Sequence, residues 1–280
     1  MKNNSFQPFF LVGCSRSGTT FLQSLLAAHP QISSFTESHF YHFMAPLEYE
    51  PKRYAFNLAS KRLKPHIKQY FEQEIKRPEL LTYFPNLPIM RWHSNAFIKA
   101  MKCLTLEQGN HVFLEKTPDH IYYISYIVKY VQNAKFIHII RNGSEVIASL
   151  YEATHQYPQP WGGARSLDLC IENWLKAIEI TQQYMNYPNH IIVGYQNLVN
   201  NPESTLEKLC EFMELNFDRQ MLTNYTKASE KLTLQQAGRS VKNEIINTGL
   251  NKFYTVFDET QQQYVLSQIK NINLELINQI

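Results

Sequence analysis

A glycine-rich loop near the amino terminus is the segment of this sequence with the clearest capacity for chemistry. Residues 13–20 read Gly-Cys-Ser-Arg-Ser-Gly-Thr-Thr, and the two glycines have the spacing of a phosphate-binding loop. Such a loop turns successive backbone N–H groups inward, and the positive end of the next helix attracts an anion. The residues expected to bind a phosphate-like group are Ser15, Arg16, Ser17, Gly18, Thr19 and Thr20.

The position of the cation in this loop argues against magnesium-dependent phosphoryl transfer. A nucleotide kinase or ATPase has a lysine directly after the second glycine, where this chain has Thr19. The cation here is Arg16, inside the loop. An acidic residue that would bind the metal is also missing from the later strand at 135–140, which ends in Arg141. A divergent phosphate-loop kinase stays open as an alternative.

The elements that must position this loop follow an alternating pattern of strands and helices. The expected strands span 8–12, 32–35, 111–114, 135–140 and 190–195, and the expected helices include 19–29, 142–155 and 202–215. Between 39 and 110 six prolines interrupt aromatic-rich helical pieces without a strand pattern, which indicates a helical insert. The fold class predicted is α/β, a parallel β-sheet flanked by helices, with the insert capping the site.

Length and composition limit the remaining possibilities. A chain of 280 residues with 44% hydrophobic residues is sufficient for one large domain, which we expect to span 1–280. A net charge of +3 is too small to indicate a nucleic-acid or membrane partner. The four cysteines form no CxxC pair and no zinc-like cluster, and no apolar run is long enough for a signal peptide or membrane span. We therefore expect a soluble, cytoplasmic protein.

The loop resembles that of a known enzyme family. Ser-Arg-Ser-Gly-Thr-Thr, followed by a leucine-rich helix that ends in His29-Pro30, is similar to the 5′-phosphosulfate loop of sulfotransferases that use 3′-phosphoadenylyl sulfate (PAPS). The resemblance covers most of 8–215 in motif order. It implies sulfonate transfer from PAPS, with 3′-phosphoadenosine 5′-phosphate (PAP) as product and without a required metal.

A second signature of this family, which binds the 3′-phosphate of the donor, has counterparts further along the chain. An arginine that closes a buried strand and a serine eight residues later correspond to Arg141 and Ser149. Eight helical residues advance about 12 Å, so a phosphate must lie across the first turns of the helix to contact both. The polar, glycine-punctuated stretch at 231–257 is expected to form a mobile flap. The resemblance also implies that Tyr195 lies near the adenosine and that a late basic segment closes over the phosphate. Candidates in that segment are Arg239, Ser240, Lys242 and Lys252.

Two departures from the family pattern affect these details. Asn142-Gly143 replaces the common Asp-Pro after the arginine, and Gln196-Asn197 replaces an acidic pair after the tyrosine. The backbone turn after Arg141 is therefore expected to differ slightly. The contacts with the anion need not change.

The catalytic residues implied by the resemblance are Glu37, Lys116 and Arg16. In the branch that includes bacterial, glycan and protein-tyrosine sulfotransferases, a glutamate at the spacing of Glu37 is the general base. We expect Glu37 to follow a strand beside the first one, so that it points into the same crevice as the loop. Lys116 corresponds to the lysine that binds the bridging oxygen and stabilises the leaving phosphate.

Other residues near these positions leave alternatives open. His39 and His42 compete for the role of base, because another branch of the family uses a histidine, although Pro118 stands where that histidine would be. Glu115 either orients Lys116 or only balances its charge.

The acceptor is expected to bind between the insert at 39–110 and the loop at 155–165. Their aromatic side chains could stack on a sugar or a phenol, or could simply pack: Tyr41, Phe43, Tyr49, Trp92, Tyr157 and Trp161. A small molecule, a glycan, a lipid or a carrier-tethered metabolite with a hydroxyl or amine all stay open, as does the oligomeric state. A non-catalytic nucleotide-binding module is a further alternative.

Overall fold

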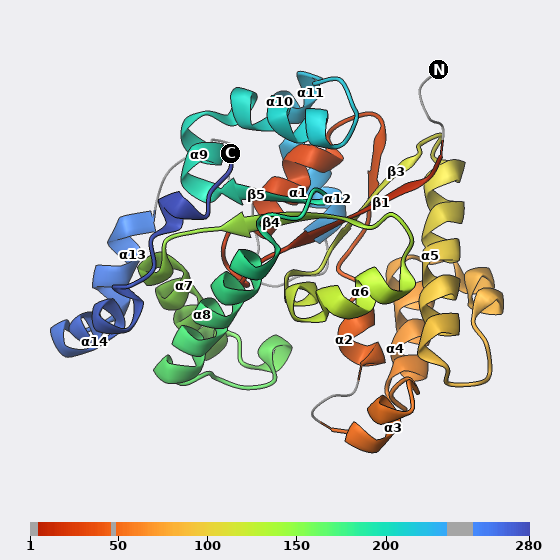
Figure 1. Cartoon of the computed structure of the whole chain (residues 1–280), viewed down its shortest axis with the longest axis horizontal. Helices are drawn as coiled ribbons and strands as arrows, with labels where there is room; N and C mark the ends of the chain where they lie inside the picture. Colours follow the sequence, from red (N-terminus) through yellow and green to blue (C-terminus); the bar gives the residue numbers. More distant parts are fainter. Residues whose placement is uncertain (1–4, 46–48, 234–248) are drawn as a thin grey trace.

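The computed structural model describes residues 5–45, 49–233 and 249–280, and its centre is a five-stranded parallel sheet (Figure 1). The strand order is β2-β3-β1-β4-β5. The strands are β1 (Gln7–Val12), β2 (Ile32–Ser34), β3 (Val112–Lys116), β4 (Lys135–Ile140) and β5 (His190–Gly194). All four pairings are parallel, so the carboxyl ends of the strands lie along one edge of the sheet. The predicted parallel α/β fold is confirmed.

The prediction that the second strand lies beside the first is wrong. β3 lies between β1 and β2, with Leu11 paired to Lys116 and Ile32 paired to Val112. β1 is central and buried on both faces, and its neighbours β3 and β4 are longer than β2, with five and six residues that are mostly apolar and buried. β2 has only three residues, two of them serines, and this short strand forms the edge of the sheet.

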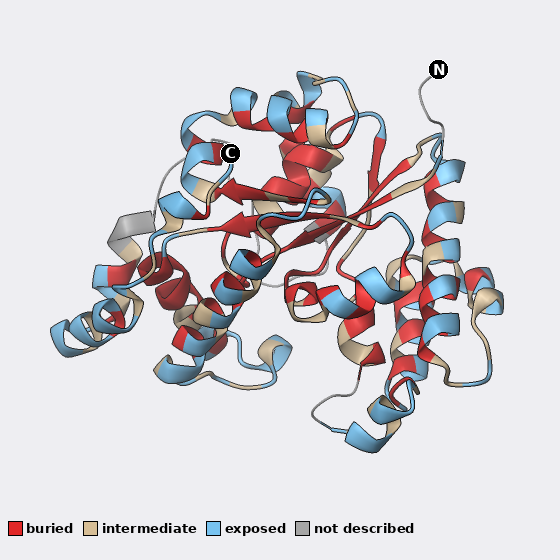
Figure 2. Cartoon of the chain, viewed as in Figure 1, coloured by how far each residue is buried: buried red, intermediate tan, exposed pale blue. Residues whose placement is uncertain are grey.

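Helices cover both faces of the sheet because side chains alternate along each strand. Phe9 and Leu11 point to one face, whereas Phe10 and Val12 point to the other. The helices on the Phe9 face are α1 (Thr19–Ala27), α10 (Pro202–Phe212), α11 (Gln220–Thr223) and α12 (Tyr225–Thr233). The helices on the Phe10 face are α6 (Ile124–Tyr130), α7 (Gly143–Gln156) and α8 (Leu167–Tyr184). Figure 2 shows the strands buried and the outer surfaces of these helices exposed.

In its described residues, the insert at 39–110 consists of helices joined by turns, and its only β contact is an isolated bridge between Leu58 and Ile89. Its α-helices are α2 (Phe40–Met44), α3 (Pro51–Ala55), α4 (Leu63–Gln69) and α5 (Met90–Glu107), together with the π-helix η1 (Tyr70–Glu74) and the 3-10 helix η2 (Pro78–Tyr83). The rings of Phe40 and Phe97 stack with centroids 4.3 Å apart, which joins α2 to α5. Tyr41 meets Phe10 of β1 edge-on, so α2 attaches the insert to the sheet.

The connection after β3 begins with a 3-10 helix, η3 (Pro118–Tyr123), before α6. η4 (Gln159–Trp161) lies in the loop after α7, and α9 (Tyr195–Asn200) follows β5 directly. The chain ends with α13 (Gly249–Val256), α14 (Glu259–Ile269) and η5 (Leu274–Leu276). No helix in the described ranges has both the length and the apolar character needed to cross a membrane.

The prediction of a mobile flap over 231–257 is wrong for the carboxyl-terminal part of that range. Residues 249–256 form α13, and Phe253 and Phe257 are buried in the main core. The ring of Phe257 lies 5.3 Å from that of Tyr151 on α7. Burial of two aromatic rings fixes this segment against α7. Residues 234–248 lie outside the described residues.

Candidate active site

The predicted phosphate loop connects the carboxyl end of β1 to the first turn of α1. Gly18 is the N-cap of α1 in a left-handed conformation with φ of 99°, and it forms no side-chain cap hydrogen bond. A Cβ at Gly18 would lie 2.4 Å from the ring of Tyr195, and one at Gly13 would lie 2.6 Å from the carbonyl oxygen of Ile139. Both positions therefore require glycine, because neighbouring chain segments pack directly against the loop.

The rest of the loop is compact and largely buried. Ser15, Ser17 and Thr19 are buried, and the N–H of Ser17 donates to the carbonyl of Cys14 at 3.1 Å. Arg16 has φ of 76°, a left-handed conformation that is uncommon outside glycine. The loop thus has the features of an anion site: a bare helix N-terminus, glycines that allow close approach of a ligand, and one cation. These features fit a phosphosulfate group.

Lys116 and Glu37 form a buried ion pair next to this loop. The Nζ of Lys116 donates to Oε1 of Glu37, and the two side chains are 2% and 3% exposed. The same Nζ lies 3.4 Å from Oγ1 of Thr20 on α1. Lys116 ends β3, and β3 is the neighbour of both β1 and β2. This strand order, rather than direct adjacency of β1 and β2, brings Glu37 to the loop.

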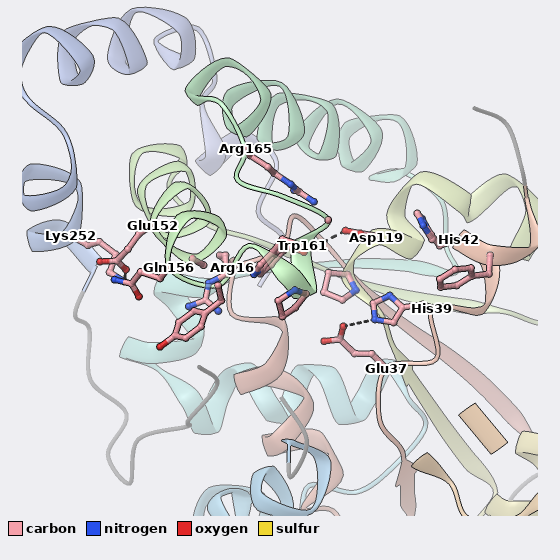
Figure 3. A pocket seen from close by; sticks show the side chains of 17 residues that line it. Arg16, Glu37, His39, His42, Asp119, Glu152, Gln156, Trp161, Arg165 and Lys252 are labelled. Atoms are coloured by element: carbon pink, nitrogen blue, oxygen red, sulfur yellow. Dashed lines mark hydrogen bonds and ion pairs between the residues drawn. The ribbon is translucent and has the colours of Figure 1, made fainter. Parts of the chain in front are cut away.

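His39 extends the ion pair toward the surface. Its Nε2 lies 3.3 Å from Oε2 of Glu37, and its side chain is 40% exposed. Figure 3 shows this contact at the edge of the cleft. His42 instead has its Nδ1 3.3 Å from the hydroxyl of Tyr123. Of the two histidines considered as alternative bases, His39 is the one with a described contact to Glu37.

The described hydrogen bonds of Glu115 go to neighbouring hydroxyl groups, and its two possible roles toward Lys116 stay predictions. Adjacent residues of a strand point to opposite faces, so Glu115 points away from the α1 face on which Lys116 lies. Oε1 of Glu115 accepts hydrogen bonds from Oγ of Ser38 at 2.7 Å and Oγ1 of Thr117 at 2.8 Å. Burial raises the pKa of Glu115 to about 7, although the hydrogen bonds from Ser38 and Thr117 act in the opposite direction.

The residues predicted for the 3′-phosphate lie at the same edge of the sheet. Arg141 packs over the ring of Tyr195 at 4.1 Å, and its guanidinium binds Glu145, with Nη2 2.6 Å and Nε 2.7 Å from Oε2. Ser149, two turns along α7, accepts a hydrogen bond from Nε of Arg16 at 3.1 Å. Tyr195 thus contacts both Arg141 and Gly18, and Ser149 contacts the phosphate loop. The predicted anion-binding residues form one connected region.

A cleft of about 750 Å³ opens beside the loop (Figure 3). This volume is in the range of small-molecule sites. Its walls contain the predicted residues Ser15, Arg16, Glu37, His39 and His42, and the aromatic residues Phe43, Tyr157 and Trp161.

The three other aromatic residues considered for the acceptor site do not line this cleft. Tyr41 is fully buried in the core and Trp92 is 46% exposed on α5. Tyr49 is also 46% exposed, and it packs against the guanidinium of Arg62.

Sequence reasoning missed two polar residues of the cleft. They are Asp119 and Glu152, whereas Gln156 and Arg165 belong to the loop at 155–165 that was expected to line the pocket. Lys252, a candidate for the basic segment over the 3′-phosphate, also lines this cleft. Glu152 and Gln156 follow Ser149 at i+3 and i+7, and this helical spacing was the available signal. Lys252 of α13 pairs with Glu152. The predicted Arg239, with Ser240 and Lys242, lies outside the described residues.

Within the described ranges, no group of three or more histidine, cysteine, aspartate or glutamate side chains is arranged to hold a metal ion. The expectation that no metal is required stays a prediction.

Comparison with known proteins identifies relatives of this chain. An uncharacterised protein of Aquifex aeolicus is 28% identical over 234 residues, which is 79% of this chain and 27% of that protein. A protein-tyrosine sulfotransferase of Drosophila melanogaster is 23% identical over 220 residues, 76% of this chain and 39% of that protein. The chain spans well under two thirds of the length of both relatives.

A solved structure has a similar fold over nearly the whole chain. The sulfotransferase domain from the curacin biosynthetic pathway superimposes with a TM-score of 0.60 at 19% identity, and the match covers 95% of this chain and 98% of that domain. The family profile described as "Sulfotransferase family" matches residues 8–219. That range contains the five strands apart from Gln7, the first residue of β1, together with the phosphate loop, Glu37, Lys116 and Arg141, and the chain therefore belongs to the sulfotransferase family.

Proposed function

We propose that this protein transfers a sulfonate group from PAPS to a hydroxyl or amine of an acceptor bound in the cleft, with PAP as the second product. The observation that carries the proposal is the buried Lys116–Glu37 pair next to the phosphate loop. A base and a cation side by side at an anion-binding loop are the groups that sulfonate transfer requires.

The donor is expected to lie along the carboxyl edge of the sheet. The loop at 13–18 and the first turn of α1 bind its 5′-phosphosulfate, and Arg141 with Ser149 binds its 3′-phosphate. Tyr195 lies against Gly18 and under Arg141, which supports a place for it beside the adenosine. An arginine has five N–H donors, so Arg141 can bind a phosphate while it keeps its contact with Glu145. Arg239 would close over this phosphate.

Transfer is proposed as an in-line displacement. The acceptor oxygen or nitrogen forms a bond to sulfur while the bond from sulfur to the bridging oxygen of the donor breaks. Glu37 takes the proton of the acceptor, and His39 contacts the oxygen of Glu37 that faces away from Lys116. Lys116 donates to the bridging oxygen as negative charge develops there, and Arg16 with the loop N–H groups binds the sulfonate. PAP leaves with the electrons of the broken bond.

The acceptor site is proposed to be the part of the cleft beyond Glu37. Its lining combines the aromatic rings of Phe43, Tyr157 and Trp161 with charged groups such as Asp119 and Arg165. This mixture supports an acceptor with both an apolar face and polar substituents, such as a small molecule, a glycan or a carrier-tethered metabolite.

The test is a transfer assay with ³⁵S-labelled PAPS and a panel of phenols, saccharides and carrier-linked hydroxy acids. Glu37→Gln and Lys116→Ala are expected to abolish transfer while PAP still binds in calorimetry. Lys135→Ala is the matched control, because Lys135 forms an exposed pair with Glu214 at the opposite end of β4. Near-wild-type turnover in both active-site variants would refute the assignment.

A thermal-shift comparison separates the alternatives. A ligand that binds only the native state raises stability by RT ln(1 + [L]/Kd), about 2.7 kcal/mol at one hundred times Kd. We expect PAP to stabilise the protein more than ATP with Mg²⁺. The reverse order would favour a kinase. Binding of PAP without transfer to any acceptor of the panel would favour a non-catalytic module.

A further inference from the structure

The segment at 36–39, which carries Glu37, is held by side chains from two different parts of the fold. From the insert, the hydroxyl of Tyr70 donates to the carbonyl of Thr36 at 3.2 Å, and Nε2 of His66 lies 2.6 Å from the carbonyl of Ser38. From the sheet side, the hydroxyl of Thr117 accepts a hydrogen bond from the N–H of His39 at 3.2 Å. The residues on both sides of Glu37 are therefore attached to their surroundings.

Glu115 determines how the hydroxyl groups of Ser38 and Thr117 are oriented. Oε1 of Glu115 accepts from the hydroxyls of both Ser38 and Thr117. A hydroxyl has one proton and two lone pairs, so a hydroxyl that donates to a carboxylate has its lone pairs left for backbone N–H groups. The hydroxyl of Thr117 accepts from the N–H of His39, and that of Ser38 accepts from the N–H of Phe40 at 3.2 Å. One carboxylate oxygen thus orients two of the contacts that hold the backbone after Glu37.

His120 is a third group that faces this carboxylate. Its Nε2 accepts the N–H of Tyr41 at 3.2 Å, so in the neutral ring the proton is on Nδ1. Burial lowers the pKa of His120 well below its ordinary value, which keeps the ring neutral. Nδ1 lies 3.7 Å from Oε1 of Glu115, beyond hydrogen-bond distance, and it has no hydrogen-bond partner among the described residues.

The burial of the Glu115 carboxylate does not by itself stabilise the folded protein. Glu115 is 1% exposed, and a buried charged group is destabilising relative to an apolar residue of similar size. Glu115 is not among the residues that line the cleft. Its described hydrogen bonds instead go to the segment that carries the base and to Thr117, which holds the same segment.

We propose that Glu115 is a positioning residue, which holds the carboxylate of Glu37 in its reactive position through Ser38 and Thr117. This rests on the proposed function, since it takes Glu37 to be the base. Because Glu37 must meet both Lys116 and the acceptor, a displacement of about 1 Å in its segment is expected to slow transfer on the order of 100-fold.

The test removes the two hydroxyl contacts with little change of volume. Thr117→Val and Ser38→Ala are each expected to lower kcat about 10-fold or more and to leave the Kd of PAP unchanged. Thr105→Val is the matched control, because Thr105 is also fully buried but donates only to the carbonyl of Met101 within α5. The control is expected to keep wild-type kcat. An equal loss of kcat in Thr105→Val would overturn the proposal.

Two substitutions of Glu115 separate hydrogen bonding from charge. Glu115→Gln keeps an oxygen that accepts from both hydroxyls, and it should keep kcat within about threefold of wild type. Glu115→Ala removes the acceptor and should lose at least as much as Thr117→Val. If Glu115→Gln is as slow as Glu115→Ala, the charge acts rather than the hydrogen bonds, and the proposal fails.

Amide hydrogen exchange provides a measurement that does not depend on turnover. The N–H groups of His39 and Phe40 are expected to exchange at least 10-fold faster in Thr117→Val and Ser38→Ala respectively, with no such change in Thr105→Val. Unchanged exchange in the first two variants would contradict the proposal. If the wild type transfers no sulfonate but exchange responds as expected, the proposed function fails and the anchoring of the segment stands.

Discussion

Glu115→Gln is expected to change how the stability of the protein depends on pH. Burial raises the pKa of Glu115 from its ordinary 4.5 to about 7 in the folded protein. One pKa unit corresponds to about 1.4 kcal/mol, so this shift destabilises the folded state by roughly 3 kcal/mol once the carboxyl is ionised. Glutamine has no proton to lose and avoids this penalty.

The sign follows from proton binding. Between pH 4.5 and about 7 the folded protein keeps the proton of Glu115 while the unfolded chain loses it, so wild-type stability falls as the pH rises through this window. The groups that face Glu115 are Glu37, which raises its pKa, the neutral ring of His120, and the buried phenols of Tyr41 and Tyr70. The difference in unfolding free energy, Glu115→Gln minus wild type, should therefore increase by about 2 to 3 kcal/mol between pH 5 and pH 8.

Urea unfolding at pH 5, 6, 7 and 8 measures this difference, and other titrating groups cancel because both proteins contain them. Glu172→Gln, which removes an exposed carboxylate from α8, is the matched control. A flat difference for Glu115→Gln would refute the reasoning. It would mean that Glu115 is ionised in the folded protein at pH 5, with its charge stabilised by its hydrogen bonds.

Three further perturbations test the donor site and the core. Gly18→Ala should lower the unfolding free energy by about 1 to 3 kcal/mol and weaken PAP binding, because a Cβ there meets the ring of Tyr195 and φ is 99°. Chemical denaturation measures the first effect and calorimetry the second. An unchanged unfolding free energy would contradict the packing of Tyr195 against Gly18. Arg141→Lys should weaken PAP binding about 10-fold or more in calorimetry, because a lysine lacks the planar fork that packs on Tyr195; an unchanged Kd would exclude Arg141 from the site. His138→Gln should make the unfolding free energy less dependent on pH below neutrality. Burial and the charge of His190 lower the pKa of His138 to about 3, so the wild type loses stability as the pH falls below about 6.5. Urea midpoints at pH 6.5, 5.5 and 4.5 measure this loss. If the midpoint changes equally with pH in both proteins, the reasoning is refuted.

Local patterns were sufficient to predict most of the fold. β4 begins and ends at the predicted residues 135 and 140, because an apolar run bounded by polar residues and a turn fixes a buried strand. The glycine spacing and the strand before it predicted the phosphate loop for a similar reason, since only glycine allows the close approaches at positions 13 and 18. These features depend on residues close together in the sequence.

The order of the strands could not be predicted in the same way. Nothing in the short β2 run indicates whether its partner is β1 or β3, and the pairing is decided by which long apolar strands take the centre of the sheet. The same limit applies to Glu115. Its neighbour Lys116 is one residue away, yet the two side chains lie on opposite faces of β3, and only the fold shows what each face meets.

The sequence by itself determined the chemistry that this protein carries: an anion-binding loop with Arg16, a lysine and an arginine at the ends of strands, and a glutamate after a short strand. The tertiary structure alone decided which of these groups meet. Glu37 and Lys116 are 79 residues apart in sequence and form a buried pair. Their contact depends on β3 lying between β1 and β2 and on an insert that holds the segment of Glu37. Such contacts follow from packing over long sequence separations, which local residue patterns do not encode.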